Sequence, residues 1–111
     1  MQIAEEESKK AVLRALLDDH SRIILASTMT GPKSVVDLTR EQKIPITSAY
    51  RKVKELKEFG LLKVDRFIVT NDGKKYELIK SVIKTANVHF DGGHLDVNVR
   101  GGQYRIPCLG G

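Results

Sequence analysis

The sequence predicts an α+β fold, mainly helical, in which four helices are followed by two β-hairpins. Two observations carry this prediction. Apolar residues recur at helical spacing through about residue 60. Beyond that point they alternate with polar residues in short runs, and these runs flank two glycine-containing turn signals at residues 71–73 and 91–93. With 111 residues, the chain is long enough to bury a core without disulfides or metal.

Two helices are predicted before residue 30. Residues 4–17 consist of helix-forming residue types. The expected apolar face of this helix comprises Val12, Leu13, Leu16 and Leu17. Residues 18–21 (DDHS) are expected to break the helix. Residues 22–27 then form a second helix, which is almost wholly apolar and should therefore be buried in the middle of the domain.

The third helix is predicted from its N-terminal boundary. Ser34 occupies an N-cap position and Asp37 follows three residues later, which is the spacing of a capping box. The helix should then run from Val35 to about Gln42. Residues 43–45 (KIP) form a short turn, because a proline biases the residue before it away from helical geometry.

The fourth helix should run from about Ile46 to Phe59 and end at Gly60, a favoured residue after a helix C-terminus. At about 100° per residue, Ala49, Val53 and Leu56 share an inner, apolar face. The opposite face carries Thr47, Arg51, Lys54 and Glu58, with Ser48, Lys52 and Glu55 on one flank and Tyr50 at the boundary.

The first hairpin, residues 61–79, is predicted to have a two-residue turn at residues 72–73. This register places two apolar pairs on one face of the hairpin. The pairs are Val69 with Tyr76 and Phe67 with Leu78.

The second hairpin is predicted to turn on Gly92-Gly93. The resulting apolar pairs are Phe90 with Leu95, Val88 with Val97 and Ala86 with Val99. A three-residue loop would oppose Phe90 to His94, so only the two-residue loop keeps one apolar face. That face needs a cover, either from the helices of the same chain or from a second subunit.

The formal net charge of +5 favours a polyanionic partner, and its distribution sharpens the prediction. Residues 1–30 have net charge −1 and residues 81–111 have net charge +1. Residues 31–80 contain twelve Lys/Arg and seven Asp/Glu, net +5. The positive charge is therefore concentrated in the segment that holds the third and fourth helices and the first hairpin.

Three helices, a tight turn, a fourth helix and a basic hairpin form the winged-helix pattern. Residues 34–61, SVVDLTREQKIPITSAYRKVKELKEFGL, resemble the helix-turn-helix of ArsR-type and related archaeal winged-helix regulators. The residues that carry this resemblance are Thr47, Ser48, Arg51, Val53, Leu56, Gly60 and Leu61. The resemblance covers roughly residues 10–80. It implies that the fourth helix enters the major groove of DNA and that the hairpin, or wing, contacts the backbone.

The residues themselves support a DNA contact. Thr47 and Ser48 are short donors near a helix N-terminus, and Arg51, one turn later, is placed for guanine O6/N7. Lysines suit phosphates. The predicted DNA-binding residues are Ser34, Thr47, Ser48, Tyr50, Arg51, Lys52, Lys54, Arg66, Lys74 and Lys75. The alternatives are a solvated helix face for the charged residues and a helix–sheet seam for Tyr50.

No cofactor, metal or catalytic role is predicted. Metal-sensing ArsR-type regulators carry cysteines on the helix before the turn, where this chain has VVDL at residues 35–38. His89 and His94 are expected to face Asp96 and Asp91 as polar cross-strand pairs, with a metal site or pH switch as the alternative. No nucleophile–base pair or phosphate-binding glycine loop occurs, so the protein is not expected to be an enzyme.

The sequence thus predicts a sequence-specific transcriptional regulator that binds double-stranded DNA as a homodimer. Its expected parts are a winged helix-turn-helix at 1–80, a hairpin at 81–100 that packs on the domain or on a dimer partner, and a flexible tail at 101–111. The acidic start and the lack of a long apolar stretch predict a cytoplasmic, nucleoid-associated protein without a membrane segment. The alternatives are a winged-helix protein–protein adaptor and a sequence-neutral nucleic-acid or chromatin binder.

Overall fold

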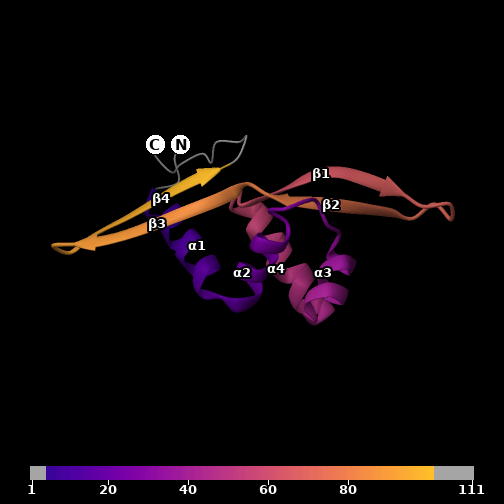
Figure 1. Ribbon diagram of the computed structural model, residues 1–111, viewed down its shortest axis with the longest axis horizontal. Helices are drawn as coiled ribbons and strands as arrows, with labels where there is room; N and C mark the ends of the chain where they lie inside the picture. The colour runs from indigo at the N-terminus through magenta and orange to yellow at the C-terminus, as the bar shows by residue number, and fades with distance from the viewer. Residues whose placement is uncertain (1–4, 102–111) are drawn as a thin grey trace.

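The computed structural model describes residues 5–101, which fold into four helices followed by two antiparallel hairpins (Figure 1). The elements are α1 (Glu5–Leu17), α2 (Asp19–Ser27), α3 (Val35–Gln42), α4 (Ile46–Glu58), β1 (Leu62–Val69), β2 (Lys75–Ser81), β3 (Ile83–Asp91) and β4 (His94–Gly101). The predicted α+β class and element order are therefore confirmed. Ala4 and the tail at 102–111, including Cys108, lie outside the described residues.

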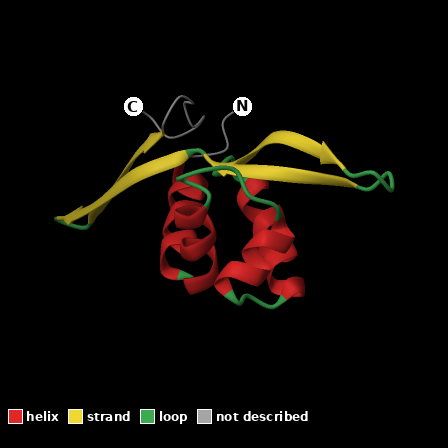
Figure 2. Cartoon of the chain, turned by 45° about the vertical axis from the view of Figure 1, so that its right-hand side comes forward, coloured by secondary structure: helices red, strands yellow, loops and turns green. Residues whose placement is uncertain are grey.

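The four helices lie on one side of the two hairpins, and the hairpins extend in opposite directions (Figures 1 and 2). β1 pairs only with β2, and β3 pairs only with β4, among the strands of residues 5–101. The molecule is consequently elongated, measuring 56 × 27 × 23 Å.

One apolar core joins the helices to the bases of both hairpins. It contains Val12, Ala15, Ile24, Leu25, Leu38, Ile44, Ala49, Val53, Leu56, Leu61, Leu62, Ile79, Val82, Ile83 and Val97. Ile24, Leu38 and Ile79 are completely buried. The expected burial of the second helix holds for Ile24 and Leu25, whereas Ala26 is exposed.

The boundary between α1 and α2 differs from the prediction. Asp18 caps α2 by accepting a 2.8 Å hydrogen bond from the Ser21 N–H, so the helix begins at Asp19, three residues earlier than expected. Leu17 was expected in the apolar face of α1 but is 79% exposed. The buried stripe is centred on Val12 and Ala15, and Leu17 lies about 140° around the helix from Val12.

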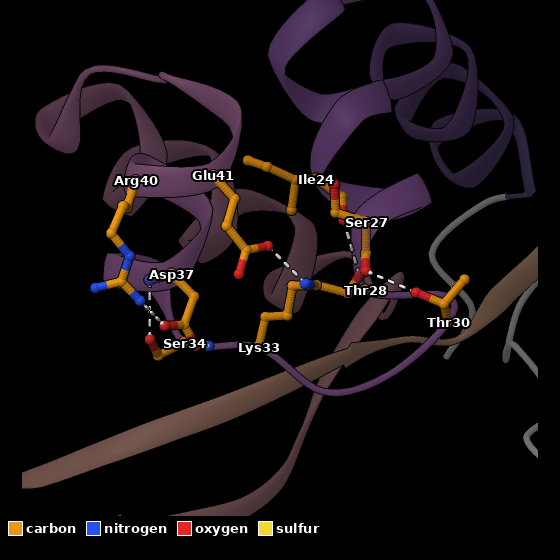
Figure 3. Close-up of polar contacts among 9 residues, drawn as sticks. All are labelled: Ile24, Ser27, Thr28, Thr30, Lys33, Ser34, Asp37, Arg40 and Glu41. Atoms are coloured by element: carbon orange, nitrogen blue, oxygen red, sulfur yellow. Dashed lines mark hydrogen bonds and ion pairs between the residues drawn. The ribbon is translucent and has the colours of Figure 1, made fainter.

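The predicted capping box of α3 is present. Ser34 Oγ accepts from the Asp37 N–H and Asp37 Oδ2 accepts from the Ser34 N–H, each at 3.1 Å (Figure 3). Lys33, just before the cap, exchanges two backbone hydrogen bonds with Ile79 of β2, at 2.8 and 3.0 Å. This bridge pairs Lys33 with β2 and so ties the start of α3 to the β1–β2 hairpin.

The turn between α3 and α4 spans residues 43–45, as predicted. Lys43 adopts a left-handed conformation with φ of 56°, and the next residue, Ile44, is buried. At the other end of α4, Gly60 has φ of +77° and donates to the Lys57 carbonyl, while Leu61 donates to the Leu56 carbonyl. These two bonds are those of a Schellman motif, so the predicted role of Gly60 is confirmed.

The predicted register of the first hairpin is wrong by one residue. Val69 pairs with Lys75, Ile68 with Tyr76 and Phe67 with Glu77. The loop contains three residues rather than two: the Gly73 N–H donates to the Thr70 carbonyl at 3.0 Å, and Gly73 has φ of +86°. A type I turn followed by a left-handed glycine has this geometry. A register shift between Val64 and Arg66 then changes the pairing again towards the base of the hairpin.

The predicted register of the second hairpin is confirmed. Phe90 pairs with Leu95, Val88 with Val97 and Ala86 with Val99. Gly92 and Gly93 have φ of 57° and 84°, as a two-residue type I′ turn requires.

A single residue, Val82, separates β2 from β3. It is buried, and its N–H donates a 2.9 Å hydrogen bond to the Leu61 carbonyl. The preceding Ser81 N–H donates to the carbonyl of Thr28, which is itself fully buried at the end of α2. The joint between the two hairpins is therefore held against the helical core.

Candidate nucleic-acid interface

The inner face of α4 determines which of its side chains reach solvent. Ala49, Val53 and Leu56 are buried in the core, as predicted. The helix packs against α2, α3 and β1, so residues 5–101 leave the face opposite these three residues uncovered.

The uncovered face carries donors and cations. Thr47, Arg51 and Lys54 are exposed. Tyr50 is 54% exposed, so it is not buried between the helix and a sheet. Within residues 5–101, neither Arg51 nor Lys54 forms an ion pair with another side chain. Their charges are therefore available to an external anion.

The N-terminus of α4 adds backbone donors to this face. Pro45 is the N-cap residue and supplies no side-chain hydrogen bond. The first helical hydrogen bond from this end joins the Ala49 N–H to the Pro45 carbonyl at 2.9 Å, so the N–H groups of residues 46–48 have no helical acceptor. Unpaired N–H groups at a helix N-terminus favour anions such as phosphate.

Lys52 does not join the uncovered face. Its Nζ lies 3.3 Å from Oδ1 of Asp18, the residue that caps α2, and its side chain is only 19% exposed. Lys52 occupies the flank of α4 that faces the start of α2. The positive charge of Lys52, which was predicted to contact phosphate, is therefore paired with the Asp18 carboxylate within the fold.

Ser34 is also placed apart from the other predicted contacts. The residue is 8% exposed and its hydroxyl accepts the Asp37 N–H in the capping box (Figure 3). Beside it, Arg40 pairs with the Asp37 carboxylate at 2.8 Å, and Lys33 pairs with Glu41 at 2.6 Å. The polar side chains around the start of α3 therefore bond mainly to one another.

The three cations of the β1–β2 hairpin that were predicted to contact DNA are exposed. Arg66 has a 65% exposed side chain, 3.6 Å from the carboxylate of the adjacent Asp65. Lys74 and Lys75 lie at the tip, and the Nζ of Lys75 is 4.2 Å from the centroid of the Phe67 ring. The observed register explains this contact, because it puts Lys75 and Phe67 on the same face.

Sequence reasoning missed two cations that bear on this surface. Lys43 is exposed in the turn directly before α4. Lys57, in the last turn of α4, pairs with Glu77 of β2 at 2.8 Å and so links the helix to the hairpin. The position of Lys43 beside a proline turn was a usable signal, whereas the Lys57–Glu77 pair depends on a register that the sequence did not reveal.

The carboxylate of Asp18 has a pKa below its ordinary value of 3.8, mainly because the Ser21 backbone N–H donates to it and also because Lys52 is close. A folded-state pKa below the unfolded one stabilises the fold above about pH 3.8, and this contribution is lost as the pH falls through the folded-state pKa. We expect the stability difference between the wild type and Asp18→Asn to shrink as the pH is lowered from about 6 to about 2.5, in thermal unfolding followed by circular dichroism.

The matched control for this experiment is Asp19→Asn. Asp19 is one residue away, its side chain is 82% exposed, and its ion-pair partner within the described residues is the exposed Arg22. A difference for Asp18→Asn that stays constant with pH would contradict the assigned role of the Asp18 carboxylate.

The two histidines of the second hairpin form the expected cross-strand pairs. His89 lies opposite Asp96 and His94 lies opposite Asp91, and all four are exposed. Within the described part of the chain, no group of three or more His, Cys, Asp or Glu side chains could hold a metal ion.

No protein-family model matches the chain, and no curated protein matches it significantly. Between residues 5 and 101, no helix has both the length and the apolar character needed to cross a bilayer.

Proposed function

We propose that this protein is a winged helix-turn-helix transcriptional regulator that binds double-stranded DNA in a sequence-specific manner. In this proposal α4 enters the major groove and the β1–β2 hairpin is the wing that contacts the backbone. The observation that carries it is the uncovered face of α4, where Thr47, Arg51 and Lys54 lie beside a helix N-terminus without a side-chain cap.

The arrangement of the elements supports this assignment. α3 and α4 are joined by a three-residue turn, and a hairpin follows α4 directly. The backbone bridge from Lys33 to Ile79 ties the start of this helix pair to the hairpin. The net charge of +5 in residues 31–80 falls on these elements.

The geometry refines the predicted contacts. Arg51 is the candidate for reading base edges, while Lys54, Lys74 and Lys75 suit phosphates. Lys43 joins them, and Lys52 and Ser34 act within the fold. As a homodimer in the cytoplasm, associated with the nucleoid, the regulator would present two α4 helices to successive major grooves about 34 Å apart.

A protein–protein adaptor is the second candidate function, and one observation favours it. The β1–β2 hairpin exposes apolar side chains near its tip: Phe67 at 50%, Ile68 at 43%, Val69 at 66% and Tyr76 at 36%. Exposed apolar groups of this kind occur at protein interfaces. The cations at the same tip favour DNA instead.

Fluorescence anisotropy with a labelled random duplex across a salt series tests the proposal. We expect a dissociation constant of about 1–100 µM near physiological salt, weakening steeply as salt rises, because phosphate contacts release counterions. Reversing two charges on α4, with Arg51→Glu and Lys54→Glu together, should abolish binding.

The matched control reverses two charges at the opposite hairpin, with Lys84→Glu and Arg100→Glu. Both residues are exposed, and the net charge changes by the same amount. Equal losses in the two double variants would indicate a general charge effect. An absence of binding by the wild type even at low salt would refute DNA binding and support the adaptor.

A further inference from the structure

In the part of the chain that the structure describes, the apolar face of the β3–β4 hairpin is buried near its base and exposed towards its tip. Ala86, Val88 and Phe90 of β3 share this face with Leu95, Val97 and Val99 of β4. Near the base of the hairpin, Val99 packs against the core. In the middle, Val97 is 6% exposed, whereas its cross-strand partner Val88 is 49% exposed. Near the tip, Leu95 is 38% and Phe90 71% exposed. An apolar surface thus continues directly from the core into solvent.

We infer that this tip face is the surface on which two copies of the chain meet. The inference deepens the homodimer of the proposed function and names its interface. Isolated two-stranded hairpins are marginally stable in water, and a hairpin gains stability when its apolar face is covered. Of the two hairpins, this one projects away from α3 and α4, so pairing through it leaves the proposed DNA-binding face free (Figure 1).

Charge distinguishes a second copy from a polyanion as the occupant. Residues 62–81 contain five Lys/Arg and three Asp/Glu, net +2. Residues 83–101 contain two of each, net zero, although the whole chain has net charge +5. Two copies of this basic chain therefore repel each other least when they approach through the neutral β3–β4 hairpin. The basic β1–β2 hairpin suits DNA instead. The apolar face itself carries no charged side chain, so contact between copies buries none.

A two-fold axis between the copies makes the contact self-complementary. Each Phe90 then packs on Val88 and Leu95 of the partner subunit, in a single isologous patch. Six residues of a strand such as β3 extend about 20 Å, so the apolar face of this two-stranded hairpin offers an area of only a few hundred Å². A standard interface buries about 800 Å² per partner. The proposed interface is smaller than that, so we expect a dimer dissociation constant in the micromolar range.

Sedimentation velocity of the full chain without DNA tests this interface. At roughly 100 µM the wild type should sediment with twice its chain mass of 12.4 kDa. Phe90→Glu should raise the dimer dissociation constant about 30-fold or more, as loss of a central aromatic contact does. Val88→Glu is a second variant of the same face and should act in the same direction.

Two control variants separate this face from other surfaces. Phe67→Glu places the same substitution on a half-exposed aromatic of the other hairpin, and Asn87→Glu places a charge on the opposite face of the same hairpin. Both should leave the dimer intact, and circular dichroism should show an unchanged fold in all variants.

A wild type that stays monomeric at roughly 100 µM would overturn the inference. Dissociation by Phe67→Glu, or by Asn87→Glu as strongly as by Phe90→Glu, would also overturn it. Because DNA is absent from the experiment, a dimer that dissociates as expected but binds no duplex would refute the proposed function alone.

Discussion

Substituting Arg51→Ala should remove most of the preference for a selected operator over random duplex while leaving random-duplex binding within several-fold of the wild type. Arg51 is exposed on α4, about one turn from the helix N-terminus, and forms no ion pair with another described side chain. A bidentate arginine–guanine contact contributes about 1–3 kcal/mol of discrimination against the wrong base, or roughly 5- to 150-fold in the ratio of affinities. The measurement is anisotropy with both duplexes at one fixed salt concentration.

Lys74→Ala is the comparison for this experiment. Lys74 is an exposed cation at the tip of the wing, where only the backbone is expected within reach. Its loss should weaken binding to both duplexes equally and reduce the dependence of log affinity on log salt by about one unit. If Arg51→Ala behaves in the same way as Lys74→Ala, α4 contacts phosphates only, and the protein is a sequence-neutral binder.

Replacing Leu38 by alanine should destabilise the protein by about 2–5 kcal/mol, a large share of the stability of a domain this small. Leu38 is the fully buried side chain of α3, at 0% exposure, within the core shared by all four helices. Truncation leaves a cavity in this core. Urea unfolding followed by circular dichroism measures the change, and the midpoint should fall without a change in slope.

Val36→Ala provides the control on the same helix. Val36 is 38% exposed and lies outside the core cluster, so its truncation should alter stability by about 0.5 kcal/mol or less. A Leu38→Ala variant as stable as Val36→Ala would mean that α3 is not packed as described.

The parts of the fold that depend on local chemistry were predictable. The Ser34 and Asp37 capping box and the Gly60 helix end each follow from a few consecutive residues, and both are present. The β3–β4 register was predictable because only one loop length kept Val88, Phe90 and their partners on one face.

The β1–β2 register was not predictable, because both two- and three-residue loops suit the turn sequence. The choice depends on Gly73 adopting a left-handed conformation after a type I turn. A second register shift near Asp65, in the same direction, places Val64 opposite Ile79. The two shifts add to two residues at the base of the hairpin. Because an offset of two residues keeps each side chain on its original face, the apolar pattern of the sequence does not reveal them.

The candidate site was partly predictable for a related reason. Helical periodicity identified the uncovered face that holds Arg51 and Lys54. It did not identify the partner of Lys52, because Asp18 is distant in sequence and reaches α4 only through the packing of α2. The charge of a side chain can be read from the sequence, whereas its availability depends on neighbours that the fold brings together.

The buried joint at Val82 has a consequence for the spacing of DNA half-sites. In the proposed dimer, one hairpin lies on DNA and the other lies on the partner subunit, and a single core-anchored residue connects their strands. Such a short, core-anchored connection holds the two hairpins at a fixed angle, unlike a flexible linker. The distance between the two α4 helices is then a fixed dimension of the assembly, and inserting a few base pairs between half-sites would leave one subunit unable to reach its groove.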